Sequence, residues 1–111
     1  MKRVRTRIIA LAATKGGVGK STLSAALAVR ASEESKKVAI LDGDTGQNSL
    51  SRWWQLRGSP KNPNLVKVEC TPEGVGLVGA QGYEWLFIDT PPRGVDEIGQ
   101  AISVADFVLI P

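Results

Sequence analysis

The sequence contains no histidine and a single cysteine, Cys70. Without histidine the chain lacks the commonest metal ligand and the commonest general base. Any metal binding or acid–base catalysis therefore has to use carboxylates, hydroxyls and lysines. One cysteine excludes a disulfide framework and a cluster bound by several thiolates of this chain, and is typical of a reducing cytosol. No apolar run is long enough to span a membrane. We therefore expect a cytoplasmic protein without a membrane segment.

Length and charge indicate one soluble domain. The chain has 111 residues, of which 42% are hydrophobic and 23% charged, an ordinary globular composition. The net charge of +3 is mild, although the first seven residues include the bases Lys2, Arg3, Arg5 and Arg7. Such a tail can contact nucleic acid, or it can simply be solvated ahead of the first strand, which is the simpler interpretation.

A glycine-rich segment, residues 14–22 (TKGGVGKST), lies between an apolar run at about 6–13 and a helix-period segment at about 20–34. Its three glycines allow backbone N–H groups to wrap an anion closely, and the helix that follows adds a partial positive charge at its N-terminus. Lys20 is placed to reach the β- and γ-phosphates of a nucleotide, and the Ser21 hydroxyl to bind Mg²⁺. The order of strand, loop and helix therefore predicts a phosphate-binding loop.

The rest of the chain alternates strands and helices, which predicts right-handed crossovers and a parallel sheet. We expect an α/β fold with about five parallel strands and flanking helices. The expected strands after the first lie at about 38–41, 65–69, 83–88 and 107–110, and the later helices at about 49–57 and 95–103. The first helix is expected to pack on the sheet through Leu23, Ala26, Leu27 and Ala31. Of the adjacent Trp53 and Trp54, at least one is expected in the core, since adjacent residues do not share a helix face.

Carboxylates follow two of the expected strands. Asp42 and Asp44 follow the second strand, and Asp89 ends the strand at 83–88. Ligands of open α/β sheets bind at the carboxyl ends of the strands, so these acids lie where a metal would. Asp89 in particular has the setting of a Walker B aspartate, which holds Mg²⁺, often through water. Taken alone, residues 42–50 are equally compatible with an Asp-Gly-rich turn whose acids are solvated.

The stretch 74–79 (GVGLVG) matches the dinucleotide-binding pattern G-x-G-x-x-G. Four residues, including Pro72, separate it from the preceding expected strand, so the tight strand-to-helix turn of that pattern is missing. We therefore expect a loosely formed, glycine-weakened helix rather than a dinucleotide site.

Two motifs together indicate a family. Residues 15–22 (KGGVGKST), with Thr14 where the general loop pattern has glycine, resemble the deviant Walker A motif of the ParA/MinD family of dimeric ATPases. Residues 89–92 (DTPP) also resemble that family. The resemblance covers nearly the whole chain, and implies that 1–111 forms a single P-loop NTPase domain of the SIMIBI type, truncated to the N-terminal part of a longer family domain.

Two positions depart from the family pattern. Residues 42–47 resemble its switch I segment, usually Asp-x-Asp-Pro-Gln, but Thr45 and Gly46 stand where one proline is expected. Arg93 stands in switch II where a small residue is common. These departures bear on loop geometry and therefore on the rate of hydrolysis.

The resemblance implies a ParA-like ATPase that uses ATP and Mg²⁺ to drive plasmid or chromosome partitioning through an ATP-dependent homodimer. It also implies a ParB-like adaptor that stimulates hydrolysis, and non-specific DNA binding through regions beyond residue 111. Lys15 would reach the partner's phosphates across the dimer, and Asp44 would orient the attacking water. The implied nucleotide-binding residues are Lys15, Gly16, Gly17, Val18, Gly19, Lys20, Ser21 and Thr22. The implied metal-site residues are Ser21, Asp42 and Asp89, and the implied catalytic residues are Lys15, Lys20 and Asp44.

Other functions of this architecture stay open. A MinD-like membrane-surface regulator shares these motifs but requires a C-terminal amphipathic helix. An iron–sulfur reductase needs interface cysteines, and Cys70 does not follow a switch motif. A bacterial tyrosine kinase would have a tyrosine-rich tail, whereas Tyr83 is the only tyrosine, and a small-molecule kinase would have glycine at position 14. An inactive fragment is the last alternative.

Overall fold

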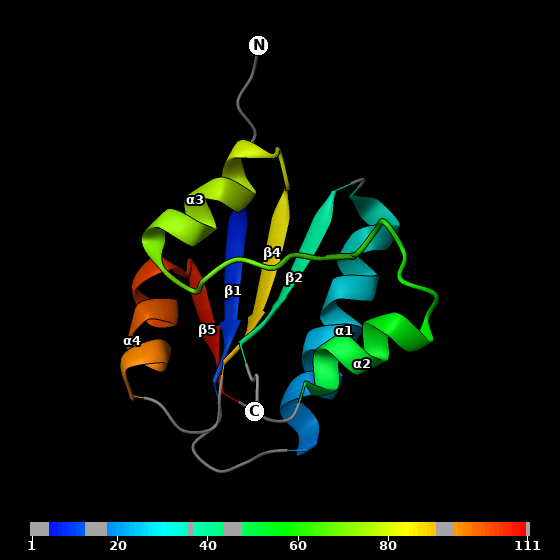
Figure 1. Ribbon diagram of the computed structural model, residues 1–111, viewed down its shortest axis with the longest axis horizontal. Helices are drawn as coiled ribbons and strands as arrows, with labels where there is room; N and C mark the ends of the chain where they lie inside the picture. The colour runs from blue at the N-terminus through cyan, green and yellow to red at the C-terminus, as the bar shows by residue number, and fades with distance from the viewer. Residues whose placement is uncertain (1–4, 13–17, 36, 44–47, 91–94, 111) are drawn as a thin grey trace.

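The computed structural model describes residues 5–12, 18–35, 37–43, 48–90 and 95–110. Five parallel strands form one sheet in the order β3-β2-β4-β1-β5, which confirms the expected fold class. Helices α1 and α2 cover one face of the sheet, and α3 and α4 cover the other (Figure 1). The strands are β1 (Arg7–Leu11), β2 (Val38–Asp42), β3 (Asn64–Leu65), β4 (Trp85–Asp89) and β5 (Phe107–Leu109). The helices are α1 (Val18–Glu34), α2 (Ser49–Leu56), α3 (Pro72–Ala80) and α4 (Val95–Val104).

Alternate residues of each central strand supply two separate cores, because successive side chains of a strand point to opposite faces. In β4, Phe87 packs in the core under α1 and α2. Its neighbours Leu86 and Ile88 are fully buried in the core under α3 and α4. The strands therefore read as continuous apolar runs, as expected for a parallel sheet covered on both faces.

The buried face of α1 differs from the expected one. Ala25 and Ala28 are buried against the sheet, whereas Ala26 is exposed. Leu23 and Leu27 are only partly buried at the margin of the same core. The two buried alanines are small, so they let the helix axis approach the sheet more closely than leucines would.

The strand expected at 65–69 is much shorter in the structure. β3 covers only Asn64–Leu65, at the edge of the sheet beside β2. One further backbone bond, from Val66 N–H to the Ile40 carbonyl at 2.9 Å, follows the strand. The chain then crosses in front of the sheet to reach α3 on the other side (Figure 1). The alternating pattern that suggested a strand instead arises because Val66 is buried and Val68 packs on the core under α3.

Helix α3 contains the G-x-G-x-x-G stretch in its interior, which agrees with the rejection of a dinucleotide site. Its N-cap is Thr71, whose hydroxyl oxygen accepts a hydrogen bond from Gly74 N–H at 3.1 Å. Gly74 is required by close packing, since a Cβ atom there would lie 1.9 Å from the carbonyl oxygen of Glu69. The glycine therefore serves the approach of one backbone to another rather than a phosphate.

Candidate functional site

The carboxyl ends of β1, β4 and β2 meet at one edge of the sheet. Register pairs Leu11 with Asp89 and Asp42 with Asp89, so both acids end their strands at the same level. Asp89 continues the side of β4 that includes Phe87, and therefore faces α1. Because α1 begins close to this edge, its first turns bring polar side chains to Asp89.

Lys20 and Ser21 of α1 contact Asp89 directly. The Ser21 hydroxyl donates a hydrogen bond to Asp89 Oδ2 at 2.8 Å. Lys20 Nζ lies 3.1 Å from Asp89 Oδ1, and the two side chains are 3% and 0% exposed. The structure thus brings together three of the residues that the sequence analysis selected, from segments 68 residues apart.

Among the described residues, few groups are available to fill the hydrogen-bonding capacity of this ion pair. Lys20 Nζ and Asp89 Oδ1 form an ion pair, and neither atom has another hydrogen-bond partner among the described residues. A buried ammonium carries three donors, and leaving them unmet is costly. The arrangement therefore suits an anion that Lys20 would bind, together with a cation bound by the Asp89 carboxylate.

The donor set fits Mg²⁺ accompanied by phosphates. Magnesium prefers oxygen ligands and is usually held by one or two carboxylates together with waters and substrate phosphates. In the described part of the chain, no group of three or more acidic or cysteine side chains gathers into a complete metal cage. A hydroxyl from Ser21 and a carboxylate from Asp89 would therefore supply only part of such a coordination shell.

Burial raises the pKa of the Asp89 carboxyl above its ordinary value, and burial is the largest influence on that pKa. The hydrogen bond from Ser21 and the positive charge of Lys20 act in the opposite direction, while the charge of Asp42 raises the pKa further. Desolvation dominates because the carboxylate has lost its water. A cation bound to Asp89 would favour the ionised form and reverse the direction of the shift.

Hydrogen bonds to the neighbouring strands fix the main chain on both sides of Asp89. The Thr90 hydroxyl and the Thr90 N–H both donate to the Leu11 carbonyl, at 2.7 and 3.1 Å. On the other side, Gly43 N–H donates to the Asp89 carbonyl at 2.8 Å. β4 is therefore held to both neighbouring strands at the residue whose side chain meets α1.

Asp42 has a structural contact that the sequence analysis missed. Its Oδ2 atom accepts hydrogen bonds from Ser51 N–H at 2.9 Å and from the Ser51 hydroxyl at 2.6 Å. The N-cap residue of α2, Asn48, makes no side-chain capping bond, so the carboxylate of Asp42 takes over that role for the third residue of the helix. A serine in the first turn of an expected helix is a signal for local capping, but its partner nine residues away could not be read from the pattern.

Four of the remaining selected residues have no described geometry. Lys15, Gly16, Gly17 and Asp44 lie outside the described residues, so their roles stay predictions. Val18 and Gly19 form the start of α1, and Thr22 is exposed one residue beyond Ser21.

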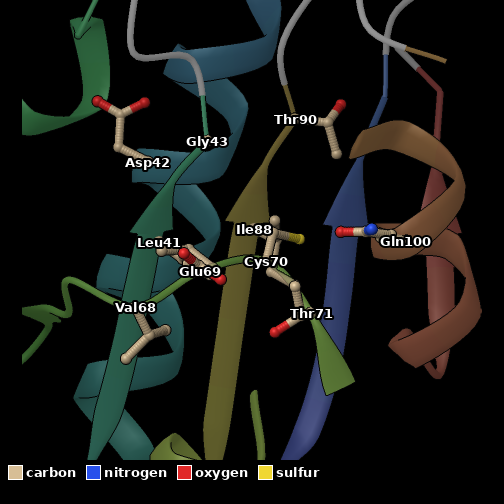
Figure 2. Close-up of a pocket in the computed structure, with 10 residues that line it drawn as sticks. All are labelled: Leu41, Asp42, Gly43, Val68, Glu69, Cys70, Thr71, Ile88, Thr90 and Gln100. Atoms are coloured by element: carbon tan, nitrogen blue, oxygen red, sulfur yellow. The ribbon is translucent and has the colours of Figure 1, made fainter. Parts of the chain in front are cut away.

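A cavity of about 470 Å³ lies at the same edge, on the face that bears α3 and α4 (Figure 2). Gly43 and Thr90 line it at the strand ends, and Gln100 extends from α4 over the sheet toward Cys70. Burial raises the pKa of the Cys70 thiol, which favours the neutral form. Lys20 is not among the residues that line this cavity, and sequence reasoning did not identify the cavity.

The parallel sheet, the helix that follows β1 and the buried lysine–serine–aspartate contact define a P-loop nucleotide-binding domain of the α/β class. The family comparison agrees. The model of the CobQ/CobB/MinD/ParA nucleotide binding domain matches residues 9–107, and the chain belongs to this family. The resemblance to ParA and MinD is thereby confirmed, and with it a domain of the ATP-binding kind.

Individual proteins show how far the similarity extends. An uncharacterised ATP-binding protein of Methanocaldococcus jannaschii is 37% identical over 111 residues, which cover 92% of this chain and 42% of that protein. The chromosome-partitioning ATPase Soj of Thermus thermophilus is 30% identical over 140 residues, which cover 100% of this chain and 56% of Soj. A crystal structure of a proposed plasmid partition protein from Borrelia burgdorferi B31, bound to AMPPNP, has a TM-score of 0.73 at 24% identity. That match covers 96% of this chain and 62% of the other, so the chain spans about half the length of such relatives.

Among the described residues, no helix is long and apolar enough to cross a bilayer.

Proposed function

We propose that this chain is the nucleotide-binding part of a ParA-type partition ATPase, which binds ATP with Mg²⁺ and hydrolyses it. The observation that carries the proposal is the buried contact of Lys20 with Asp89, in which Nζ and Oδ1 lack hydrogen-bond partners among the described residues. A purely structural ion pair in the core would be expected to have its polar atoms satisfied. Among the described residues, this pair instead leaves donors and acceptors without partners, close to the start of α1.

Each described residue has a role in this proposal. Lys20 binds the β- and γ-phosphates and neutralises charge that develops during transfer. Ser21 and Asp89 would hold the metal, and Asp42 would shape the surroundings of the metal while it anchors α2. When bound, Mg²⁺ supplies Lewis-acid stabilisation of the phosphate oxygens.

The roles of Lys15 and Asp44 are carried over from the family resemblance. Lys15 reaches the phosphates of a second protomer, which makes dimerisation depend on ATP, and Asp44 orients the attacking water. A ParB-like adaptor and non-specific DNA are the proposed partners of the whole protein. The name of the Thermus relative, a chromosome-partitioning ATPase, supports this choice. A MinD-like role in positioning at a membrane surface is the alternative, because MinD belongs to the same family.

The test compares the two lysines with an exposed one. Binding of a fluorescent ATP analogue with and without Mg²⁺ is measured for wild type, Lys20→Ala, Lys15→Ala and the control Lys61→Ala, and ATP-dependent dimerisation is followed by light scattering. We expect Lys20→Ala to lose nucleotide binding and Lys61→Ala to behave like wild type. Lys15→Ala should retain most of the binding but fail to dimerise with ATP.

Two outcomes would overturn the proposal. Wild-type affinity in Lys20→Ala would remove the phosphate-binding role of that lysine. Normal ATP-dependent dimerisation in Lys15→Ala would remove the ParA-type mechanism while leaving an ATP-binding domain.

A further inference from the structure

The chain between Asp44 and Glu69 contains no acidic residue but has four bases, Arg52, Arg57, Lys61 and Lys67. All four side chains are exposed, and none forms an ion pair within the described part of the structure. By contrast, Arg30 on the exposed side of α1 is paired with Glu33 and Glu34. Positive charge is therefore concentrated in the segment from α2 to just beyond β3, and the ion pairs of the described residues leave it uncompensated.

Helix α2 presents an apolar side chain among these bases. Leu56 is 82% exposed, the highest value among the exposed large hydrophobic residues of the described chain. Arg52 lies four residues earlier and hence on the same helix face, and the Arg57 guanidinium lies over the Trp53 ring, 5.3 Å from its centroid. We call Arg52, Trp53, Leu56, Arg57 and Lys61 the α2 surface.

The α2 surface is fixed at both ends. The first turn of α2 is bonded to Asp42 through Ser51. At the other end, the indole N–H of Trp54 donates to the carbonyls of Pro60 and Pro63, at 3.1 and 2.9 Å, which holds the loop that carries Lys61 against the helix. A surface that is already ordered loses little conformational entropy when a partner binds.

We propose that the α2 surface docks an acidic segment of a partner protein. Its carboxylates pair with Arg52 and Arg57, whose planar guanidinium groups can bind a carboxylate through two hydrogen bonds. An apolar side chain of the same segment packs on Leu56 and the edge of Trp53. Arginine and tryptophan are the residue types most enriched in the energetic centres of protein interfaces.

The exposure of Leu56 favours a protein over a nucleic acid as the partner of the α2 surface. A phosphate backbone would use the three bases of the α2 surface but would gain nothing from Leu56, because its contacts are charged and sequence-independent. A peptide that carries both acids and apolar side chains uses the whole α2 surface. The partner class is therefore an acidic, amphipathic protein segment.

The test uses probes of defined composition. Fluorescence anisotropy is measured for a labelled peptide of glutamates and leucines, for the same peptide with its leucines replaced by serine, and for a labelled DNA duplex of random sequence. The protein variants are Arg52→Glu, Leu56→Ser and the charge-matched control Arg30→Glu, each checked for a wild-type unfolding midpoint. The salt concentration is varied to separate ion pairs in direct contact from long-range electrostatic attraction.

We expect the leucine-containing peptide to bind wild type and Arg30→Glu alike. It should lose about tenfold in affinity with Arg52→Glu and severalfold with Leu56→Ser. The serine peptide should bind wild type as weakly as the leucine peptide binds Leu56→Ser. The proposal is overturned if the leucine peptide does not bind wild type, if Leu56→Ser has no effect, or if Arg30→Glu weakens binding as much as Arg52→Glu. Tighter binding of DNA that depends on Arg52 but not on Leu56 would assign the surface to nucleic acid instead.

Discussion

Replacing Lys20 by methionine removes one charge of a buried pair and keeps a side chain of similar length. The Asp89 carboxylate left behind is 0% exposed, and among the described residues it retains only the hydrogen bond from Ser21. Removing one partner of a buried ion pair typically costs about 3–5 kcal/mol, because the other charge stays buried without compensation. Asp89 can escape part of this cost by taking up a proton, which the burial of its carboxyl already favours. We therefore expect a loss at the lower end of that range at neutral pH.

Urea unfolding followed by tryptophan fluorescence measures this loss without reference to activity. A loss of about 3 kcal/mol is a large part of the stability of a domain this size, so the midpoint should fall clearly. The matched variant is the double replacement Lys20→Met with Asp89→Leu, which removes both charges at once. Apolar replacement of a whole buried pair is often neutral or stabilising, so the double variant should recover most of what the single variant loses.

The same two variants separate stability from binding. Both lack the ammonium that we assign to the phosphates, so both should fail to bind the fluorescent ATP analogue, although the double variant is folded. The reasoning about the pair is wrong if Lys20→Met unfolds within about 0.5 kcal/mol of wild type, the ordinary scatter of surface substitutions. It is wrong about the ligand if the folded double variant binds the analogue with wild-type affinity.

The remaining predictions concern packing, capping and pH. Gly74→Ala should destabilise the domain by about 1–3 kcal/mol, since the added Cβ would lie 1.9 Å from a backbone oxygen. Gly76→Ala should instead stabilise α3 by about 0.5–1 kcal/mol, because a Cβ there has nothing within 4 Å. Thermal unfolding measures both changes, and equal midpoints for the two variants would contradict the assigned packing of Gly74. Ser51→Ala removes one of the two bonds to Asp42 and should cost about 1 kcal/mol in urea unfolding, with Ser51→Thr closer to wild type. Because the folded pKa of Asp89 is raised, the stability linked to this group is present below the ordinary carboxyl range and is lost as pH rises through the folded value. Without nucleotide or metal, Asp89→Asn should therefore flatten the fall in stability with rising pH, and an unchanged pH profile would count against the assignment.

Much of the site could be predicted because it depends on local order and on one rule of parallel sheets. The glycine-rich segment stands between a strand and a helix in the sequence itself, so Lys20 and Ser21 were expected near the start of that helix, and they lie in its first turn. Asp42 and Asp89 end strands, and parallel strands end at a common edge. No knowledge of long-range packing was needed to expect these residues near one another.

What could not be predicted depends on packing between distant segments. Ala25 and Ala26 are the same type of residue, yet Ala25 is buried and Ala26 is exposed. Which of them faces the sheet depends on how α1 is rotated about its axis, and the packing of α1 on the sheet sets that rotation. The length of β3 is set by where the chain leaves the sheet to reach α3, although the alternating residues continue beyond Leu65. The bond between Ser51 and Asp42 joins residues nine positions apart, and no local pattern in the sequence specifies it.

Because side chains of a strand alternate between the two faces of the sheet, the residues at the carboxyl end of β4 fall into two sets with different surroundings. Phe87 and Asp89 share one side of β4, toward α1, while Ile88 and Thr90 share the other and line the cavity. A slip of one residue in the pairing of β4 would exchange these sides and place the carboxylate away from Lys20. The register is held against such a slip by apolar residues buried on both faces and by the paired bonds from Thr90 to Leu11. The position of the charged pair is therefore a consequence of how the two cores pack, and substitutions that loosen either core should weaken nucleotide binding before they unfold the domain.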